Sequence, residues 1–198
     1  MKELYELDLL SGHGDNTPGK RSIYHYLPNG LVRYKENHGN ERVVNMALVY
    51  ADIFGVQANH LNPEWYDVSL EERCRRNRRP GAENRIVVAV HADAIERERC
   101  KCDPEDIHGM TIYYFSKKGK RLAEHFTAQF RRTSTFQIHI RSPRKARFKV
   151  LRSTESVAIL IEMAYMTNSK DLDLLQNVKF QKWVAKNIIL ATKALRPL

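Results

Sequence analysis

Two short, continuous apolar runs constrain the fold of this chain more than any other feature of its sequence. Residues 86–90 read IVVAV, and residues 157–161 read VAILI. Runs of this length that are rich in Val and Ile are typical of strands buried on both faces. Such strands belong to mainly parallel sheets that carry helices on each side. The chain is therefore predicted to contain an open sheet at its centre.

The segments between these runs alternate between helical and extended patterns. Asn40 is expected to cap the first long helix and Gly55 to end it, and Ser69 with Glu72 forms a capping box for the second. Helices are expected at 40–55, 69–79, 117–132 and 180–195, and further strands at 5–10 and 109–115. This order predicts an α/β three-layer sandwich with a twisted, mostly parallel central sheet and helices on both faces. Residues 1–198 are expected to form a single domain.

Charge narrows the classes of partner without choosing among them. The chain has 33 Lys and Arg against 23 Asp and Glu, a formal net charge of +10. A surface of this kind indicates a polyanionic partner, either nucleic acid or an anionic polymer of a bacterial envelope.

Targeting signals are weak in this sequence. No window has enough consecutive apolar residues to span a bilayer, and Glu3, Glu6 and Asp8 interrupt the N-terminal segment where a signal peptide would be apolar. We expect synthesis in the cytoplasm and no membrane insertion. Three cysteines are too few for a disulfide framework, and the CKC segment is expected to hold ordinary loop thiols rather than a second metal site.

Potential metal ligands follow three of the predicted strands. His13 comes after the first strand, His91 directly follows IVVAV, and Glu162 directly follows VAILI. Because the carboxyl ends of parallel strands meet at one edge of a sheet, these side chains are expected to converge. A fourth candidate, Glu41, lies in the first turn of the first long helix, where the helix dipole favours a carboxylate.

Two imidazoles and a carboxylate are a usual ligand set for catalytic zinc, and a further carboxylate then accepts a proton from water. Each residue alone has a simpler interpretation. A histidine at a strand end is often only hydrogen-bonded, and Glu41 could serve only as an N-terminal helix charge. Glu162 is harder to explain in this way, because a carboxylate that closes an apolar strand is costly to desolvate. Spacing therefore favours a metal hydrolase, without fixing the role of each carboxylate.

Several blocks of the sequence resemble those of one enzyme family. ILIEMAYMTN is close to the family pattern Val-Glu-hydrophobic-Gly-Phe-hydrophobic-Ser-Asn. The chain resembles, over nearly its whole length, zinc-dependent N-acetylmuramoyl-L-alanine amidases of bacterial autolysins and phage endolysins. The blocks, in order, are SGHG, HGNERVVNMALVYADIF, VSLEERCRRNRRPGAENRIVVAVHADA, GMTIYYFSKKGKRLAEHF and VLRSTESVAILIEMAYMTNSKDLDLLQN.

The resemblance implies one zinc ion per chain, held by His13, Glu41 and His91, with Glu162 as the catalytic carboxylate. Glu36 is an alternative to Glu41, but the RVVNMAL block that follows favours Glu41. The implied reaction is hydrolysis of the amide between N-acetylmuramic acid and the L-alanine of the stem peptide. Peptidoglycan would be the partner, and the bacterial cell wall the place of action.

Three positions depart from the family pattern. Leu10-Ser11 replace Asp-Pro before Gly-His-Gly, Asp93 replaces Asn after His-Ala, and Ala164-Tyr165 replace Gly-Phe. None of these changes removes a proposed ligand, but each alters the surroundings of the site.

The resemblance leaves no residues for a separate wall-binding domain. This compactness fits either a phage lysin or an amidase domain trimmed from a bacterial protein, and oligomeric state is not predicted. The rival interpretation is a nucleic-acid-binding module without catalysis, in which RCRRNRR and RSPRKARFK contact phosphates. No RRM-like or helix-turn-helix pattern accompanies these basic segments, so specific binding of nucleic acid is not expected.

Overall fold

The computed structural model describes residues 5–27, 30–95, 101–196 and 198. Its centre is a six-stranded sheet in the order β4-β1-β5-β8-β6-β7, and a separate hairpin pairs β2 with β3. The strands are β1 (Glu6–Ser11), β2 (Arg21–Leu27), β3 (Gly30–Lys35), β4 (Ala58–His60), β5 (Arg85–Asp93), β6 (Thr111–Tyr114), β7 (Arg144–Lys145) and β8 (Val157–Tyr165). The neighbours from β4 to β8 run parallel, and β6 is antiparallel to β8. The predicted mostly parallel sheet is confirmed.

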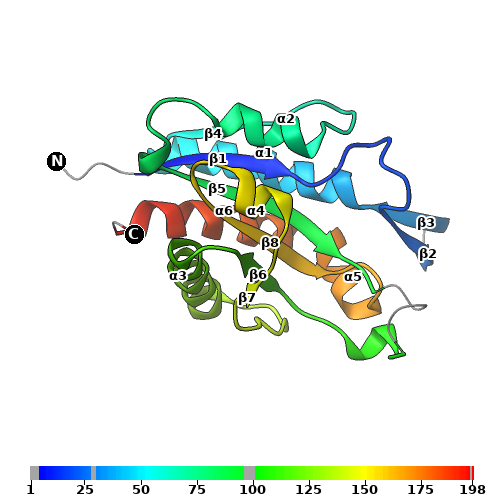
Figure 1. The fold of residues 1–198 in the computed structure, drawn as a ribbon. Helices are drawn as coiled ribbons and strands as arrows, with labels where there is room; N and C mark the ends of the chain where they lie inside the picture. The colour runs from blue at the N-terminus through cyan, green and yellow to red at the C-terminus, as the bar shows by residue number, and fades with distance from the viewer. Residues whose placement is uncertain (1–4, 28–29, 96–100, 197) are drawn as a thin grey trace.

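Helices cover both faces of this sheet (Figure 1). Helices α1, α3 and α6 pack on one face, and the short α4 packs on the other, in contact with α2. The helices are α1 (Glu36–Phe54), α2 (Leu70–Asn77), α3 (Lys117–Thr133), α4 (Lys149–Ser153), α5 (Ser169–Gln176) and α6 (Val178–Ala194), with 3₁₀ turns at Ala82–Asn84 and Pro104–Asp106. The α/β sandwich predicted from the alternation of elements is therefore confirmed.

The two apolar runs divide their side chains between the two faces. In β5, Ile86, Val88 and Val90 join the larger core under α1 and α6, and Val87 and Ala89 join the smaller core under α4. Successive side chains of a strand point to opposite faces, so both faces of a central strand must be apolar. His91 continues this alternation on the side of Val87 and Ala89.

The structure differs from the sequence-based prediction at the start of the first long helix. Asn40 does not cap it: α1 begins at Glu36, directly after β3, and Lys35 is the N-cap residue. The Asn40 amide instead donates to the Gly12 carbonyl at 3.2 Å and to Glu36 Oε1 at 3.3 Å. Gly55 ends the helix as predicted, with a left-handed φ of 66°.

Three of the five arginines in the RCRRNRR segment bind other parts of the protein. Arg73 is 3% exposed and donates to the carbonyls of Val68 and Ser11. Arg76 pairs with Glu64 and Glu72, and Arg79 pairs with Glu6 and Asp8. These three side chains therefore fasten α2 to the sheet and its loops.

The cysteines differ from expectation at one position. Cys74 is a buried free thiol, whereas Cys102 is disulfide-bonded. The expectation of free loop thiols is therefore wrong for Cys102, and Cys100 lies outside the described residues. In the part of the chain that the structure describes, no helix combines the length and apolarity needed to cross a bilayer.

Asn77 is predicted to be a major contributor to stability. Its buried amide donates to Asp8 Oδ2 at 2.9 Å and Ser156 Oγ at 3.0 Å, and accepts from the backbone N–H groups of Glu155 and Ser156. Because Asn77→Ala strands several buried polar groups, it should lower the free energy of unfolding by about 3 kcal/mol in urea titrations. The matched change at exposed Asn84 should cost no more than about 0.5 kcal/mol. Equal stability of the two variants would contradict this role.

Candidate metal centre

The SGHG segment turns sharply at the end of β1, and its two glycines are required by close approach. A Cβ atom on Gly12 would lie 2.4 Å from the His91 ring, and one on Gly14 would lie 2.1 Å from the backbone nitrogen of Asp67. Between them, His13 has a φ of 62°, the one non-glycine residue with positive φ in the described chain. Residues held in this sparsely populated region cluster at functional sites. The turn directs the His13 side chain toward His91, with ring centroids 5.1 Å apart.

His91 and Glu162 lie side by side on adjacent strands. They are register partners in the β5–β8 ladder, and Glu162 is also paired with Thr111 of β6. Both residues lie within their strands rather than after them, because the ladder continues past the apolar runs. Their side chains point to the same face, and both line one cavity with His13.

The first residue of α1 completes this group. Glu36 is 2% exposed, and its carboxylate contacts His91 Nδ1 at 3.1 Å and His13 Nε2 at 3.4 Å. It also accepts a hydrogen bond from the backbone nitrogen of Ala92 at 3.2 Å. The donor atoms of His13, Glu36 and His91 all lie within 4.8 Å of one another.

The ionisation of these groups suits ligand binding. Burial tends to raise the pKa of Glu36, but the hydrogen bond with His91 and the charges of His91 and His13 outweigh it, so the pKa lies below its usual value. Burial lowers the pKa of His13 to about 4, against the opposing charge of Glu36. A metal ion needs an ionised carboxylate and neutral imidazoles, and the pKa shifts of Glu36 and His13 favour these two forms.

The carboxylate that contacts the two histidines is Glu36, the alternative that the sequence offered, and not Glu41, which the sequence favoured as the third ligand. Because α1 begins one turn earlier than predicted, the carboxylate in its first turn is Glu36, and Glu41 follows more than one turn later. Among the described residues, Glu41 takes no part in a group of potential metal ligands. The extended pattern of GLVRYK, which ends directly before Glu36, is the signal that could have placed the helix start.

Glu162 faces the same cavity without joining the ligand group. It is buried, and its Oε2 atom has no hydrogen-bond partner among the described residues. Burial raises the pKa of Glu162 well above its usual value, and the charges of Asp93 and Glu36 add to this effect. An unpaired buried carboxyl oxygen is costly, and such groups often mark a functional site.

The cavity has a volume of about 380 Å³ and opens at the carboxyl edge of the parallel strands. One of the departures from the family pattern, Asp93, lies there and contacts a second one, Tyr165. Asp93 lines the cavity, burial raises its pKa, and a hydrogen bond from the Tyr165 side chain opposes that rise. The guanidinium of Arg141 lies 5.8 Å from the centre of the Tyr165 ring. Asp93 thus lines the cavity, and Tyr165 supports it through this hydrogen bond.

Comparison with known proteins agrees with this geometry. The model of the N-acetylmuramoyl-L-alanine amidase family (Amidase_3) matches residues 9–194. The chain belongs to this family.

Relatives and solved structures of this amidase family show how far the likeness extends. The amidase LytC of Bacillus subtilis is 26% identical over 181 residues, which cover 89% of this chain and 32% of LytC. The probable cell wall amidase LytH of Staphylococcus saprophyticus is 25% identical over 54% of this chain and 34% of its own length. The chain thus spans about a third of the length of these curated relatives.

The solved structures match over almost the full chain. The amidase AmiC2 of Nostoc punctiforme superposes with a TM-score of 0.78 and 25% identity, covering 95% of this chain and 94% of that one. An amidase from Clostridium difficile 630 gives a TM-score of 0.75 at 21% identity, covering 96% and 95%. The fold of these amidases therefore extends over almost the whole chain.

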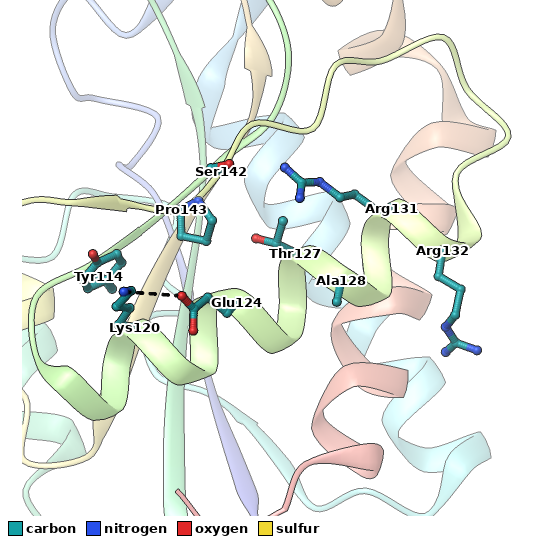
Figure 2. A pocket seen from close by; sticks show the side chains of 9 residues that line it. All are labelled: Tyr114, Lys120, Glu124, Thr127, Ala128, Arg131, Arg132, Ser142 and Pro143. Atoms are coloured by element: carbon teal, nitrogen blue, oxygen red, sulfur yellow. Dashed lines mark ion pairs between the residues drawn. The ribbon is translucent and has the colours of Figure 1, made fainter.

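A second cavity, of about 880 Å³, lies beside α3 and is unlike the first (Figure 2). In this view, Arg131 and Thr127 extend toward the segment of Ser142 and Pro143. Arg131 donates to the carbonyl of Ile140, and Lys120 pairs with Glu124 at 3.6 Å. No histidine lines this cavity. The donor set of a metal site is thus found at the carboxyl edge and not here.

The group at the carboxyl edge fits a zinc ion by its chemistry. Zinc ligands are two imidazole nitrogens and a carboxylate in many hydrolases, each about 2.0–2.2 Å from the ion. The mutual separations of the three donor atoms are compatible with such a common centre. Hydrogen bonds from the Asn40 side-chain amide and the Ala92 backbone nitrogen orient the Glu36 carboxylate. Outer contacts of this kind commonly orient metal ligands.

A titration with Zn²⁺ distinguishes the roles of Glu36 and Glu41 in metal binding. Because Glu36 contacts both histidines, Glu36→Gln should weaken Zn²⁺ binding at least tenfold by isothermal titration calorimetry. Glu41→Gln, the matched change outside the ligand group, should bind Zn²⁺ with parent affinity. The opposite ranking of the two variants would return the ligand role to Glu41.

Proposed function

We propose that this chain hydrolyses the amide that joins the lactyl group of N-acetylmuramic acid to the L-alanine of the peptidoglycan stem peptide. One observation carries the proposal. The His13–Glu36–His91 group and the unpaired carboxylate of Glu162 line the same cavity, in a chain of the N-acetylmuramoyl-L-alanine amidase family. Autolysins and phage endolysins both carry out this reaction, so the proposal names the reaction and does not choose between these two biological roles.

His13, Glu36 and His91 would hold one zinc ion. When bound, zinc polarises an amide carbonyl and makes a water molecule more acidic. The protein positions this centre through its backbone: the Gly-His-Gly turn presents His13, and the β5 strand presents His91. The buried start of α1 brings Glu36 between them.

Glu162 would act as the general base and then as the general acid. It comes from β8 beside His91 and has an oxygen free to accept a proton. The carboxylate takes a proton from the attacking water as the C–O bond forms at the amide carbon. It then gives that proton to the alanine nitrogen as the C–N bond breaks, so that the peptide leaves as an amine.

The surroundings of the cavity support binding of a peptide-bearing sugar. Apolar side chains of Leu70, Phe148 and Val150 line it beside the polar group, and Lys20 lies at its edge. Convergent polar groups within an apolar cavity are the usual make-up of a small-molecule site. The positive net charge of the chain would aid its approach to an anionic wall, more strongly at low salt.

The proposed function is tested with isolated peptidoglycan sacculi and mass spectrometry. The zinc-loaded protein should release free stem peptides that begin with L-alanine. Glu162→Gln keeps the shape of the side chain but cannot accept a proton. Its rate should fall by roughly 10² to 10⁴-fold while zinc content stays at the parent value.

The matched control is Glu155→Gln, which changes an exposed carboxylate at the other end of the same strand region and should hydrolyse at the parent rate. Peptides that retain a muramyl sugar would show cleavage at another bond. Parent activity in Glu162→Gln would remove the assigned role of Glu162.

A further inference from the structure

Two aromatic side chains stand exposed beside the metal centre. Trp65 is 69% exposed and Tyr66 is 45% exposed, and their rings contact edge to face with centroids 5.9 Å apart. Large aromatic side chains are normally covered in a folded protein. An exposed pair of this kind indicates a surface that binds something.

The pair lies on a loop that is joined to the His13 turn. The carbonyl of Trp65 accepts a hydrogen bond from the backbone nitrogen of Asp15 at 2.8 Å. The backbone nitrogen of Asp67 donates to Asn16 Oδ1 at 2.7 Å. Trp65 is thus bonded to Asp15, which lies two residues after His13, a proposed zinc ligand.

Two arginines of α2 also hold the loop of Trp65 and Tyr66 in place. The buried Arg73 guanidinium donates to Val68 and Ser11 and pairs with Asp67 at 2.7 Å. Arg76 donates to the Leu61 carbonyl at 2.7 Å. A binding surface that is fixed before the ligand arrives loses little entropy on binding. These arginines therefore present the aromatic pair in a defined position.

Exposed apolar side chains also line the candidate site. Leu70, 47% exposed, and Phe148, 43% exposed, line the cavity that holds His13 and Glu162. With Trp65 and Tyr66 they make four of the large exposed hydrophobic side chains, the others being Val49, Ile53 and Val178. Leu70 is the first residue of α2 and follows Tyr66 by four residues, so the loop of the aromatic pair leads into the lining of the cavity.

A sugar ring fits such a pair chemically. A pyranose has a face of C–H groups and an edge of hydroxyls, and the negative face of an aromatic ring attracts polarised C–H groups. Hydroxyls need polar neighbours, and Asn16, Glu64 and Asp67 lie on the same two loops.

We propose that Trp65 and Tyr66 form a saccharide platform, which binds a sugar ring of the glycan strand next to the muramyl residue whose amide is hydrolysed. The choice of a glycan as the occupant rests on the proposed function. The platform would hold the polymer while the stem peptide enters the cavity.

The chain contains two tryptophans, which allows binding to be measured without catalysis. Trp183 is partly buried among Phe130, Phe136 and Phe180, so Trp183→Phe leaves Trp65 as the reporter. Titration of this variant with chitotetraose, which has no stem peptide, should shift the fluorescence of Trp65 to shorter wavelength and saturate. Tyr66→Ala in the same background should raise the Kd roughly tenfold.

NMR of the parent protein gives the same readout without a core substitution. Of its two indole N–H signals, the Trp65 signal should move with chitotetraose and the Trp183 signal should stay. A Trp65 signal that does not respond up to the solubility limit of the sugar would overturn the platform. An equal response of both indoles would overturn it as well.

Kinetics on glycan strands then link the platform to the reaction. Trp65→Ala should raise KM about tenfold with a much smaller change in kcat, and Val178→Ala, an exposed control on α6, should change neither. Saccharide binding without any amidase activity would contradict the proposed function and leave the platform. Amidase activity without saccharide binding would do the reverse.

Discussion

The contacts of the buried Glu36 carboxylate hold the candidate site together. It lies between His13 and His91 and accepts a hydrogen bond from the Ala92 backbone, so it joins the β1 turn, strand β5 and the start of α1. A buried charge is tolerated only where partners compensate for the loss of water. These three segments must therefore come together with little freedom, and the same contacts leave two imidazoles and a carboxylate facing one point.

The central sheet could be predicted from the sequence because burial dictates residue type there. A strand covered on both faces must be apolar at every position, and IVVAV and VAILI satisfy this condition. The hairpin β2–β3 and the short helices α4 and α5 could not be predicted in the same way. They are small elements whose residues are chosen by local contacts, such as the Asn168 side chain that caps α5.

The part of the candidate site that lies on the strands could be predicted from the sequence. His91 and Glu162 follow apolar runs that pair in register, so their proximity follows from the sheet. Glu36 could not be assigned with the same security, because its position depends on where a helix begins. In α1 no side chain caps the N-terminus, and the residues of the first turn are polar. The helical pattern of apolar residues therefore begins one turn after the helix itself.

Residues around the cavity differ in kind from the candidate ligand group. Asp93 lines the cavity and is hydrogen-bonded by the Tyr165 side chain, and the loop of exposed Trp65 and Tyr66 is joined to the His13 turn by the Asp15 backbone and by Arg73. One fold can act on different substrates when the residues around its site differ. Substrate preference is thus expected to reside in these residues.

Anomalous X-ray diffraction from crystals of the zinc-saturated protein, recorded on both sides of the zinc absorption edge, tests the central claim most directly. We expect one peak per chain, about 2.0–2.2 Å from His13, Glu36 and His91, with the Glu162 carboxylate beyond ligand distance. A peak coordinated by Glu41 or Glu162, or no peak near the two histidines, would contradict the account.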